Sequence, residues 1–213
     1  MRYLNKIVFI NSAAIRYSEV QLDGNIHLIG TQGVGKSTIL RAILFFYNAD
    51  TQRLGIPVEK KSYQDYYFPY ADSSIIYEVA REDGWFTVLS YKTMNRICYR
   101  FIASPYRPDL FIDEEGAPYP SDRIRSVLDK NGIKYSGAIS TYEEYRNILY
   151  GNSDNKRDYS CYSLMESGSY QNIIRTIQNV LLNSRLEADY IKQTIITSLN
   201  EADSVIDLSR YRS

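Results

Sequence analysis

One string limits what this chain can fold into more than any other. GTQGVGKS, Gly30 to Ser37, fits the pattern G-x-x-x-x-G-K-[ST]. It joins the apolar run NIHLIG (25–30), typical of a strand, to STILRAILFFYNA (37–49), typical of a helix buried against a sheet. A glycine turn in this position directs backbone N–H groups to one point, where the helix N-terminus adds partial positive charge. The sequence therefore predicts a phosphate-binding loop.

The pattern gives each polar side chain of the loop a role. Lys36 would bridge the β- and γ-phosphates of a nucleotide and is the one catalytic residue we expect. The Ser37 hydroxyl would coordinate Mg²⁺, and Thr38 would contact the α-phosphate. The predicted nucleotide-binding residues are Gly30, Thr31, Gln32, Gly33, Val34, Gly35, Lys36, Ser37 and Thr38.

The rest of the chain supplies strands first and helices later. Alternating or apolar runs predict strands at 6–14 and 16–24, before the strand that enters the loop. A polar loop with one short helical turn at most (50–72) leads to strands 73–80, 85–92 and 96–103, whose short connections require an antiparallel meander. A fourth short strand with an acidic turn is expected at 109–120 and a helix at 121–132, ending at Asn131-Gly132. Helical spacing continues at 141–151, 169–184 and 186–211.

Composition excludes several classes. Lys plus Arg and Asp plus Glu number 25 each, so no global field favours nucleic acid. One histidine, His27, and two distant cysteines, Cys98 and Cys161, provide no zinc or disulfide framework. The apolar run at the N-terminus is too short for a signal peptide or a spanning helix, so we expect a cytoplasmic protein with no membrane contact. Tyrosines, 21 in all, are spread along the chain and fit strand and interface positions.

Two further strings leave the nucleotide class open. DEEG at Asp113 to Gly116 and NKRD at Asn155 to Asp158 match D-x-x-G and N-K-x-D of GTPases. LFIDEE could also be a Walker B strand, in which Asp113 holds Mg²⁺ through water and Glu114 activates the attacking water. The NKRD string follows a polar loop, however, and the apolar run before Asp113 is short for a central parallel strand. An acidic turn in the first string and a solvated loop in the second are favoured.

The order of these elements resembles the N-terminal half of an SMC-type ATPase head. LDGNIHLIGTQGVGKSTILRAILFFYNAD is similar to the MukB-like branch, including JetC- and MksF-type ATPases of bacterial condensin-like plasmid-defence systems. YYFPYADSSIIYEVAREDGWFTVLSYK and the helical segment after residue 162 resemble the rest of that half. The resemblance implies an α/β fold of the P-loop NTPase type, with a mixed sheet, an antiparallel meander and C-terminal helices. It covers 1–213, with an α/β lobe at 1–139 and a helical part at 140–213 that leads toward a coiled coil.

The resemblance also implies partners. In the family, ATP and Mg²⁺ are held between two heads, and hydrolysis requires a Walker B strand, a catalytic glutamate and a signature motif from a C-terminal head half. The assembled machine acts on DNA, with kleisin-like subunits as further partners, in plasmid defence or chromosome organisation. A glutamine that touches Mg²⁺ is expected after the first helix, and Gln64 is favoured over Gln52. Arg16 is a candidate to reach the nucleotide. The alternatives are a GTPase switch that uses Asp113 and Asp158, and a structural module whose phosphate loop is vestigial.

Overall fold

The computed structural model describes residues 2–23, 35–48, 62–94, 96–151 and 159–164. By its contacts the chain divides into residues 1–168 and 169–213, and the description concerns the first unit. Several predicted features lie outside the described residues: the strand at 25–30, most of the glycine loop, Gln52, the NKRD string, and the helices at 169–184 and 186–211. The mixed character of the sheet, which depends on the strand at 25–30, therefore stays a prediction.

A five-stranded sheet is the centre of the described unit. Its strand order is β2-β1-β3-β4-β5, and all four described pairings are antiparallel. The meander is confirmed, because Arg81 pairs with Gly84 and Thr93 with Arg96 across short hairpins. The strands are β1 (Tyr3–Ser12), β2 (Ile15–Gln21), β3 (Ser74–Arg81), β4 (Gly84–Thr93) and β5 (Arg96–Ile102).

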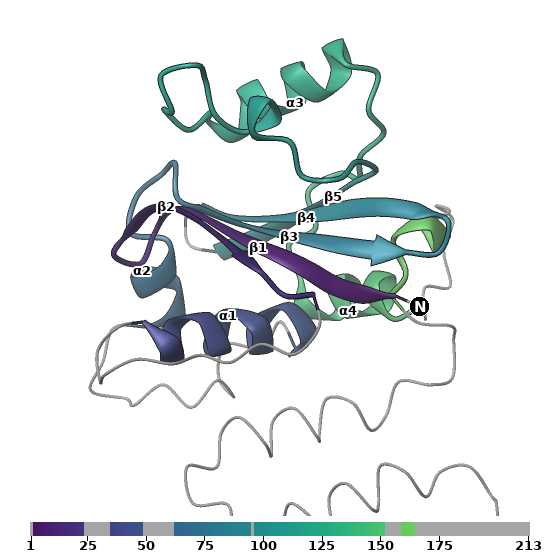
Figure 1. The fold of residues 1–213 in the computed structure, drawn as a ribbon, viewed down its shortest axis with the longest axis horizontal. Helices are drawn as coiled ribbons and strands as arrows, with labels where there is room; N and C mark the ends of the chain where they lie inside the picture. The colour runs from purple at the N-terminus through teal and green to yellow at the C-terminus, as the bar shows by residue number, and fades with distance from the viewer. Residues whose placement is uncertain (1, 24–34, 49–61, 95, 152–158, 165–213) are drawn as a thin grey trace, which may run out of the picture. The chain divides into compact units, whose positions relative to one another are not determined.

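Helices cover both faces of this sheet (Figure 1). Three of them, α1, α2 and α4, lie on one face, and α3 lies on the other. The predicted helix at 37–49 is confirmed as α1. The helices are α1 (Lys36–Asn48), α2 (Tyr63–Tyr67), α3 (Ser121–Lys130) and α4 (Tyr142–Leu149), with 3₁₀ turns η2 (Pro108–Leu110) and η3 (Ser160–Tyr162).

Local chemistry explains where two of the helices end. Thr141 precedes α4, and its hydroxyl accepts a hydrogen bond from Glu144 N at 3.3 Å, which satisfies one free N–H of the first turn. Gly151 follows α4 with a φ of +68°, and Gly132 follows α3 with a φ of +65°. Both glycines adopt the left-handed conformation that commonly ends a helix. The predicted ends at Gly132 and Gly151 are confirmed.

The face toward α3 has an aliphatic core. Ile124 and Leu128 of α3 pack with Leu110 and Phe111 onto strand residues that alternate along the sheet. The strand side chains in this cluster are Val8, Ile10, Ile76, Leu89, Tyr91, Cys98 and Ile102.

The opposite face has an aromatic core. Phe45 of α1 stacks on Tyr63 of α2, with ring centroids 4.3 Å apart, and lies 5.9 Å from Tyr99 of β5. Tyr99 is 4.4 Å from Tyr145 of α4. Tyr99 of β5 therefore contacts rings from both α1 and α4. Burial of aromatic rings on this face accounts for several of the tyrosines in the composition.

The predicted strand at 109–120 is wrong. Pro108 opens the 3₁₀ turn η2, and beyond it only the isolated bridge Ile112↔Pro118 has strand-like pairing. The Asp113 Oδ1 atom accepts hydrogen bonds from Glu115 N at 3.0 Å and Ala117 N at 2.7 Å. A carboxylate that accepts bonds from nearby backbone N–H groups stabilises a turn in place of a strand. The acidic turn favoured from the sequence is confirmed.

Described residues beyond position 139, where the α/β lobe was expected to end, also contact the sheet. Besides the Tyr99–Tyr145 contact, Tyr162 of η3 packs 5.5 Å from Phe101 of β5. The segment before α4 bonds to the edge of β5, where Tyr99 and Ile139 exchange backbone hydrogen bonds of 2.8 and 2.9 Å. Residues 140–151 and 159–164 thus pack with the sheet, because they help to bury its aromatic face.

Candidate phosphate-binding turn

The described part of the predicted loop begins at Gly35. This residue has a φ of +90°, and its carbonyl oxygen accepts the first helical hydrogen bond, from Ile39 N at 3.1 Å. A Cβ at Gly35 would meet no described atom within 4 Å, so the backbone conformation itself is what favours glycine here. Gly30, Thr31, Gln32, Gly33 and Val34 lie outside the described residues.

The first turn of α1 carries positive charge. Lys36 is its first residue, and no acidic side chain lies in that turn. A helix N-terminus already has a partial positive charge, so a lysine there is electrostatically unfavourable by about 0.3–1 kcal/mol unless an anion is near. Ser37, next along, is exposed. The turn can thus bind an anion through backbone N–H groups, the Lys36 ammonium and the Ser37 hydroxyl.

Two tyrosines of helix α2 form hydrogen bonds with the next residue of α1, Thr38. The Tyr67 hydroxyl donates to the Thr38 carbonyl oxygen at 2.7 Å. The Tyr66 hydroxyl and Thr38 Oγ1 are 3.1 Å apart and share a hydrogen bond. Thr38 itself is 8% exposed. The structure therefore brings the predicted α-phosphate ligand together with two tyrosines that the sequence analysis did not select.

The bond from Tyr67 to the Thr38 carbonyl oxygen is one of four that tyrosine hydroxyls donate to the backbone of α1. Hydroxyls of Tyr77 in β3, Tyr145 in α4 and Tyr150 after α4 also donate to its backbone carbonyls. The bonds are Tyr77 to Ala42 O at 3.1 Å, Tyr145 to Phe46 O at 2.7 Å and Tyr150 to Tyr47 O at 2.6 Å. We call these four tyrosines the α1 brace.

The α1 brace fixes the helix along its length. Phe46 and Tyr47 lie in the last turn, whose carbonyl oxygens have no N–H donor within the helix, so the hydroxyls of Tyr145 and Tyr150 supply that donor. Burial raises the pKa of Tyr67, Tyr77 and Tyr145 above the ordinary value, so their hydroxyls remain protonated donors into the alkaline pH range. Rigid placement of the helix also fixes the position of its first turn relative to the sheet.

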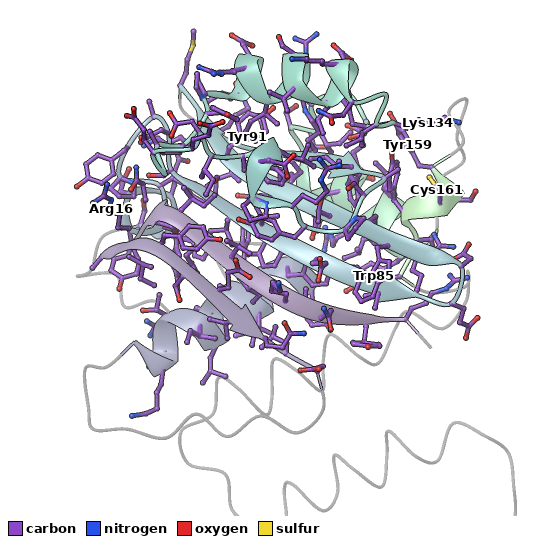
Figure 2. The ribbon with its side chains drawn as sticks, turned by 45° about the horizontal axis from the view of Figure 1, so that its top comes forward. Arg16, Trp85, Tyr91, Lys134, Tyr159 and Cys161 are labelled. Carbon is purple, nitrogen blue, oxygen red and sulfur yellow. The ribbon has the colours of Figure 1, made fainter. Side chains whose placement is uncertain are left out.

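Gln64 and Arg16 lie near elements that contact this turn. Gln64 is half-buried on α2, in a short helix where a loop was the favoured prediction, and among the described residues no hydrogen bond of its side chain is found. Strand β2 is an edge of the sheet, and its alternation places Arg16 on the face of α1, with the side chain exposed (Figure 2). At the same hairpin, Ser12 Oγ donates to Tyr67 O at 2.8 Å. Contact of Gln64 with Mg²⁺ and of Arg16 with a nucleotide both stay predictions.

Asp113 lies away from this turn. Phe111, two residues before it, packs in the core between the sheet and α3, on the face opposite α1. In addition, the Asp113 Oδ1 atom already accepts hydrogen bonds from two backbone N–H groups. A Walker B acid would end a central strand beside the phosphate loop, so the described structure gives no support to Asp113 or Glu114 as a Mg²⁺ site or to the DEEG string as a phosphate sensor.

A buried carboxylate, Glu78, is a polar feature that the sequence analysis missed. It is 6% exposed on β3, and its two oxygens accept from Asn5 Nδ2 and from Tyr106 N, both at 2.7 Å. Two strong hydrogen bonds compensate the burial of its charge. In the sequence, Glu78 alternates with Tyr77 and Val79 along a predicted strand, and this pattern gives no sign that its carboxylate is buried and hydrogen-bonded.

Arg100 is a buried cation on the same face of the sheet. It is 5% exposed on β5, and its guanidinium lies 5.3 Å from the ring centre of Tyr135. Among the described residues, its Nε and Nη1 atoms have no hydrogen-bond partner. Ring contact is thus the interaction that the described structure gives this charge.

We also searched the described residues for metal sites, disulfides and membrane-spanning helices. Within them, no group of three or more His, Cys, Asp or Glu side chains could hold a metal ion. Cys98 is buried and Cys161 exposed, and the two do not form a disulfide with each other. No described helix is both long and apolar enough to cross a membrane.

Comparison with known proteins gives a family. Searches of curated proteins and of solved structures found no match. One family model, described as a protein of unknown function (DUF3584), matches residues 12–213. The match contains the whole glycine loop, α1 and the meander, and it spans nearly the full chain. The chain therefore belongs to the DUF3584 family of proteins of unknown function.

Proposed function

We propose that this chain is the nucleotide-binding part of an SMC-like ATPase head, which binds ATP and Mg²⁺ at Gly30–Thr38. The observation that carries the proposal is the start of α1. The G-x-x-x-x-G-K-S string ends there in a glycine with a φ of +90° and a lysine as the first helical residue, on a helix held by the α1 brace. In general, such a string is diagnostic of a phosphate-binding loop when it lies between a strand and a helix.

The residues of the turn suit the chemistry of a magnesium nucleotide. Backbone N–H groups and the helix N-terminus would bind phosphate oxygens, and Lys36 would add a mobile positive charge against the β- and γ-phosphates. The Ser37 hydroxyl is exposed on the same turn, as a Mg²⁺ ligand must be. Mg²⁺ would neutralise phosphate charge when bound.

The wider assembly follows from the resemblance to SMC-type heads. ATP would be held between this head and a second one, and hydrolysis would draw on a C-terminal head half that supplies the acid and the signature motif. Cycles of head engagement and release would then act on DNA through the full assembly, with kleisin-like subunits as bridging partners. This chain would be a cytoplasmic component that binds ATP and hydrolyses it poorly by itself.

Equilibrium binding tests the proposal directly. We expect the purified chain to bind Mg-ATP in preference to Mg-GTP, and Lys36→Ala to weaken ATP binding about 10- to 100-fold, because a hydrogen bond to a charged group contributes about 1.5–3 kcal/mol. Arg41→Ala is the matched control, since Arg41 is a half-buried cation on the same helix beyond the first turn. Unchanged ATP affinity in Lys36→Ala would contradict the assignment. A preference for GTP would support the switch, and no binding to the wild type would support a structural module.

A further inference from the structure

Helix α2 is a fixed platform beside the phosphate-binding turn (Figure 1). Ser62 caps its N-terminus by accepting from Asp65 N at 3.2 Å, and Lys92 of β4 forms an ion pair with Asp65 at 3.4 Å. Tyr63 stacks on Phe45 of α1 with 4.3 Å between ring centroids. The position of α2 is thus set by contacts other than those made by Tyr66.

Tyr66 and Tyr67 differ in what they hold. Tyr67 is buried, and its hydroxyl bonds to the Thr38 carbonyl oxygen, which any residue at position 38 would present. Tyr66 is 38% exposed, and its hydroxyl bonds to the Thr38 side chain at 3.1 Å. The Tyr67 hydroxyl therefore holds the helix backbone, whereas the Tyr66 hydroxyl bonds to the threonine side chain.

The direction of the Tyr66–Thr38 bond decides what the threonine can do next. A threonine hydroxyl has one proton to donate and two lone pairs that accept. When Tyr66 donates, Thr38 Oγ1 uses a lone pair and keeps its own proton for another acceptor. A phosphate oxygen is an acceptor only, so this direction is the one compatible with a nucleotide in the turn.

We propose that Tyr66 is a positioning residue for the phosphate-binding turn, which donates to Thr38 Oγ1 and so directs the threonine proton to the α-phosphate of a bound nucleotide. The inference rests on the proposed function and extends it to a residue outside the glycine loop. Two hydrogen bonds in sequence polarise one another, so the threonine donates more strongly than it would alone. The same contact links phosphate binding to α2 and, through Asp65 and Lys92, to β4.

Tyr66→Phe tests the proposal. The variant keeps the ring and removes the hydroxyl, and we expect Mg-ATP and Mg-ADP to bind about 2- to 10-fold more weakly, the loss that corresponds to one hydrogen bond of about 0.5–1.5 kcal/mol. Both nucleotides carry an α-phosphate and should lose affinity by the same factor. Thermal stability should stay near that of the wild type, because the lost hydroxyl is at an exposed residue. Tyr70→Phe, at a residue 62% exposed, is the matched control and should bind like the wild type.

A double-mutant cycle separates positioning from general structure. Thr38→Val removes the hydroxyl that Tyr66 is proposed to orient, so adding Tyr66→Phe to that variant should cause no further loss of affinity. Independent, additive losses would overturn the proposal, as would wild-type affinity in Tyr66→Phe. If the wild type bound Mg-ATP and Tyr66→Phe did not differ, only this inference would fail; a wild type that bound no nucleotide would overturn the proposed function with it.

Discussion

Alkaline pH should unfold this protein, because the core on the α1 face holds phenols that resist ionisation. Burial raises the pKa of several tyrosines above the ordinary value of 10.0, among them Tyr63, Tyr67, Tyr77, Tyr99 and Tyr145. In the unfolded chain these phenols lose their protons near pH 10. Above that pH the folded state binds more protons than the unfolded state, so stability falls as pH rises. Below pH 10 both states are protonated and the stabilising contribution is fully present.

The size of the effect follows from the number of groups. Each phenol that stays protonated only in the folded state lowers the free energy of unfolding by about 1.4 kcal/mol per pH unit above its unfolded pKa. These five groups alone give a slope of about 7 kcal/mol per pH unit. A domain is stable by about 5–15 kcal/mol, so the unfolding midpoint should lie at about pH 11–12.

Two optical signals taken together measure this transition. Far-ultraviolet circular dichroism follows the fold, and near-ultraviolet absorbance follows tyrosinate, so the buried phenols should ionise in step with loss of the helical signal. Tyr63→Phe removes one ionisable group and should lower the slope by about 1.4 kcal/mol per pH unit, whereas Tyr70→Phe, at an exposed site, should leave it unchanged. Ionisation of all tyrosines near pH 10 with the circular dichroism intact would refute the reasoning.

Three substitutions give further expected outcomes by chemical denaturation. Glu78→Gln should lose about 1–3 kcal/mol of stability, because its amide N–H₂ would face a donor such as Tyr106 N; a change near zero would show that the site relaxes. Tyr145→Phe leaves the Phe46 carbonyl without its donor and should lower the free energy of unfolding by about 1–3 kcal/mol. An equal loss of stability when exposed tyrosines are changed to phenylalanine would argue against the α1 brace. Gly35→Ala forces a residue with Cβ to a φ of +90° and should cost about 1–2 kcal/mol together with nucleotide affinity; wild-type stability would mean that the turn can adopt another conformation.

The sequence predicted the elements whose pattern is local. Short hairpin connections required the antiparallel meander, and an apolar run after the glycine loop predicted α1 to within one residue at each end. It could not predict that β1 pairs with β3, because that pairing joins segments far apart in the chain. Residues 109–120 were misassigned since their apolar residues suit a strand, while Pro108 and the Asp113 carboxylate favour turns.

The candidate site was predictable only in part. The G-K-S string located the start of α1 because the spacing of its residues is itself the chemical requirement. Tyr66 and Tyr67 could not be found in the same way, since a tyrosine in a polar loop gives no sign of which atom its hydroxyl reaches. The tyrosine content suggested buried rings, but the carbonyls that those hydroxyls bind are known only from the fold.

The α1 brace also has a consequence for how the chain is made. Tyr145 and Tyr150 follow their partner carbonyls by 99 and 103 residues, so a nascent chain emerging from the ribosome exposes α1 long before its last turn can be completed. Contacts across such separations close late, because the loop entropy is lost before the bonds form. Any shortened version that stops ahead of Tyr145 would leave two carbonyls of that turn without these donors, and its biogenesis would need a chaperone or another chain to shield the exposed aromatic layer.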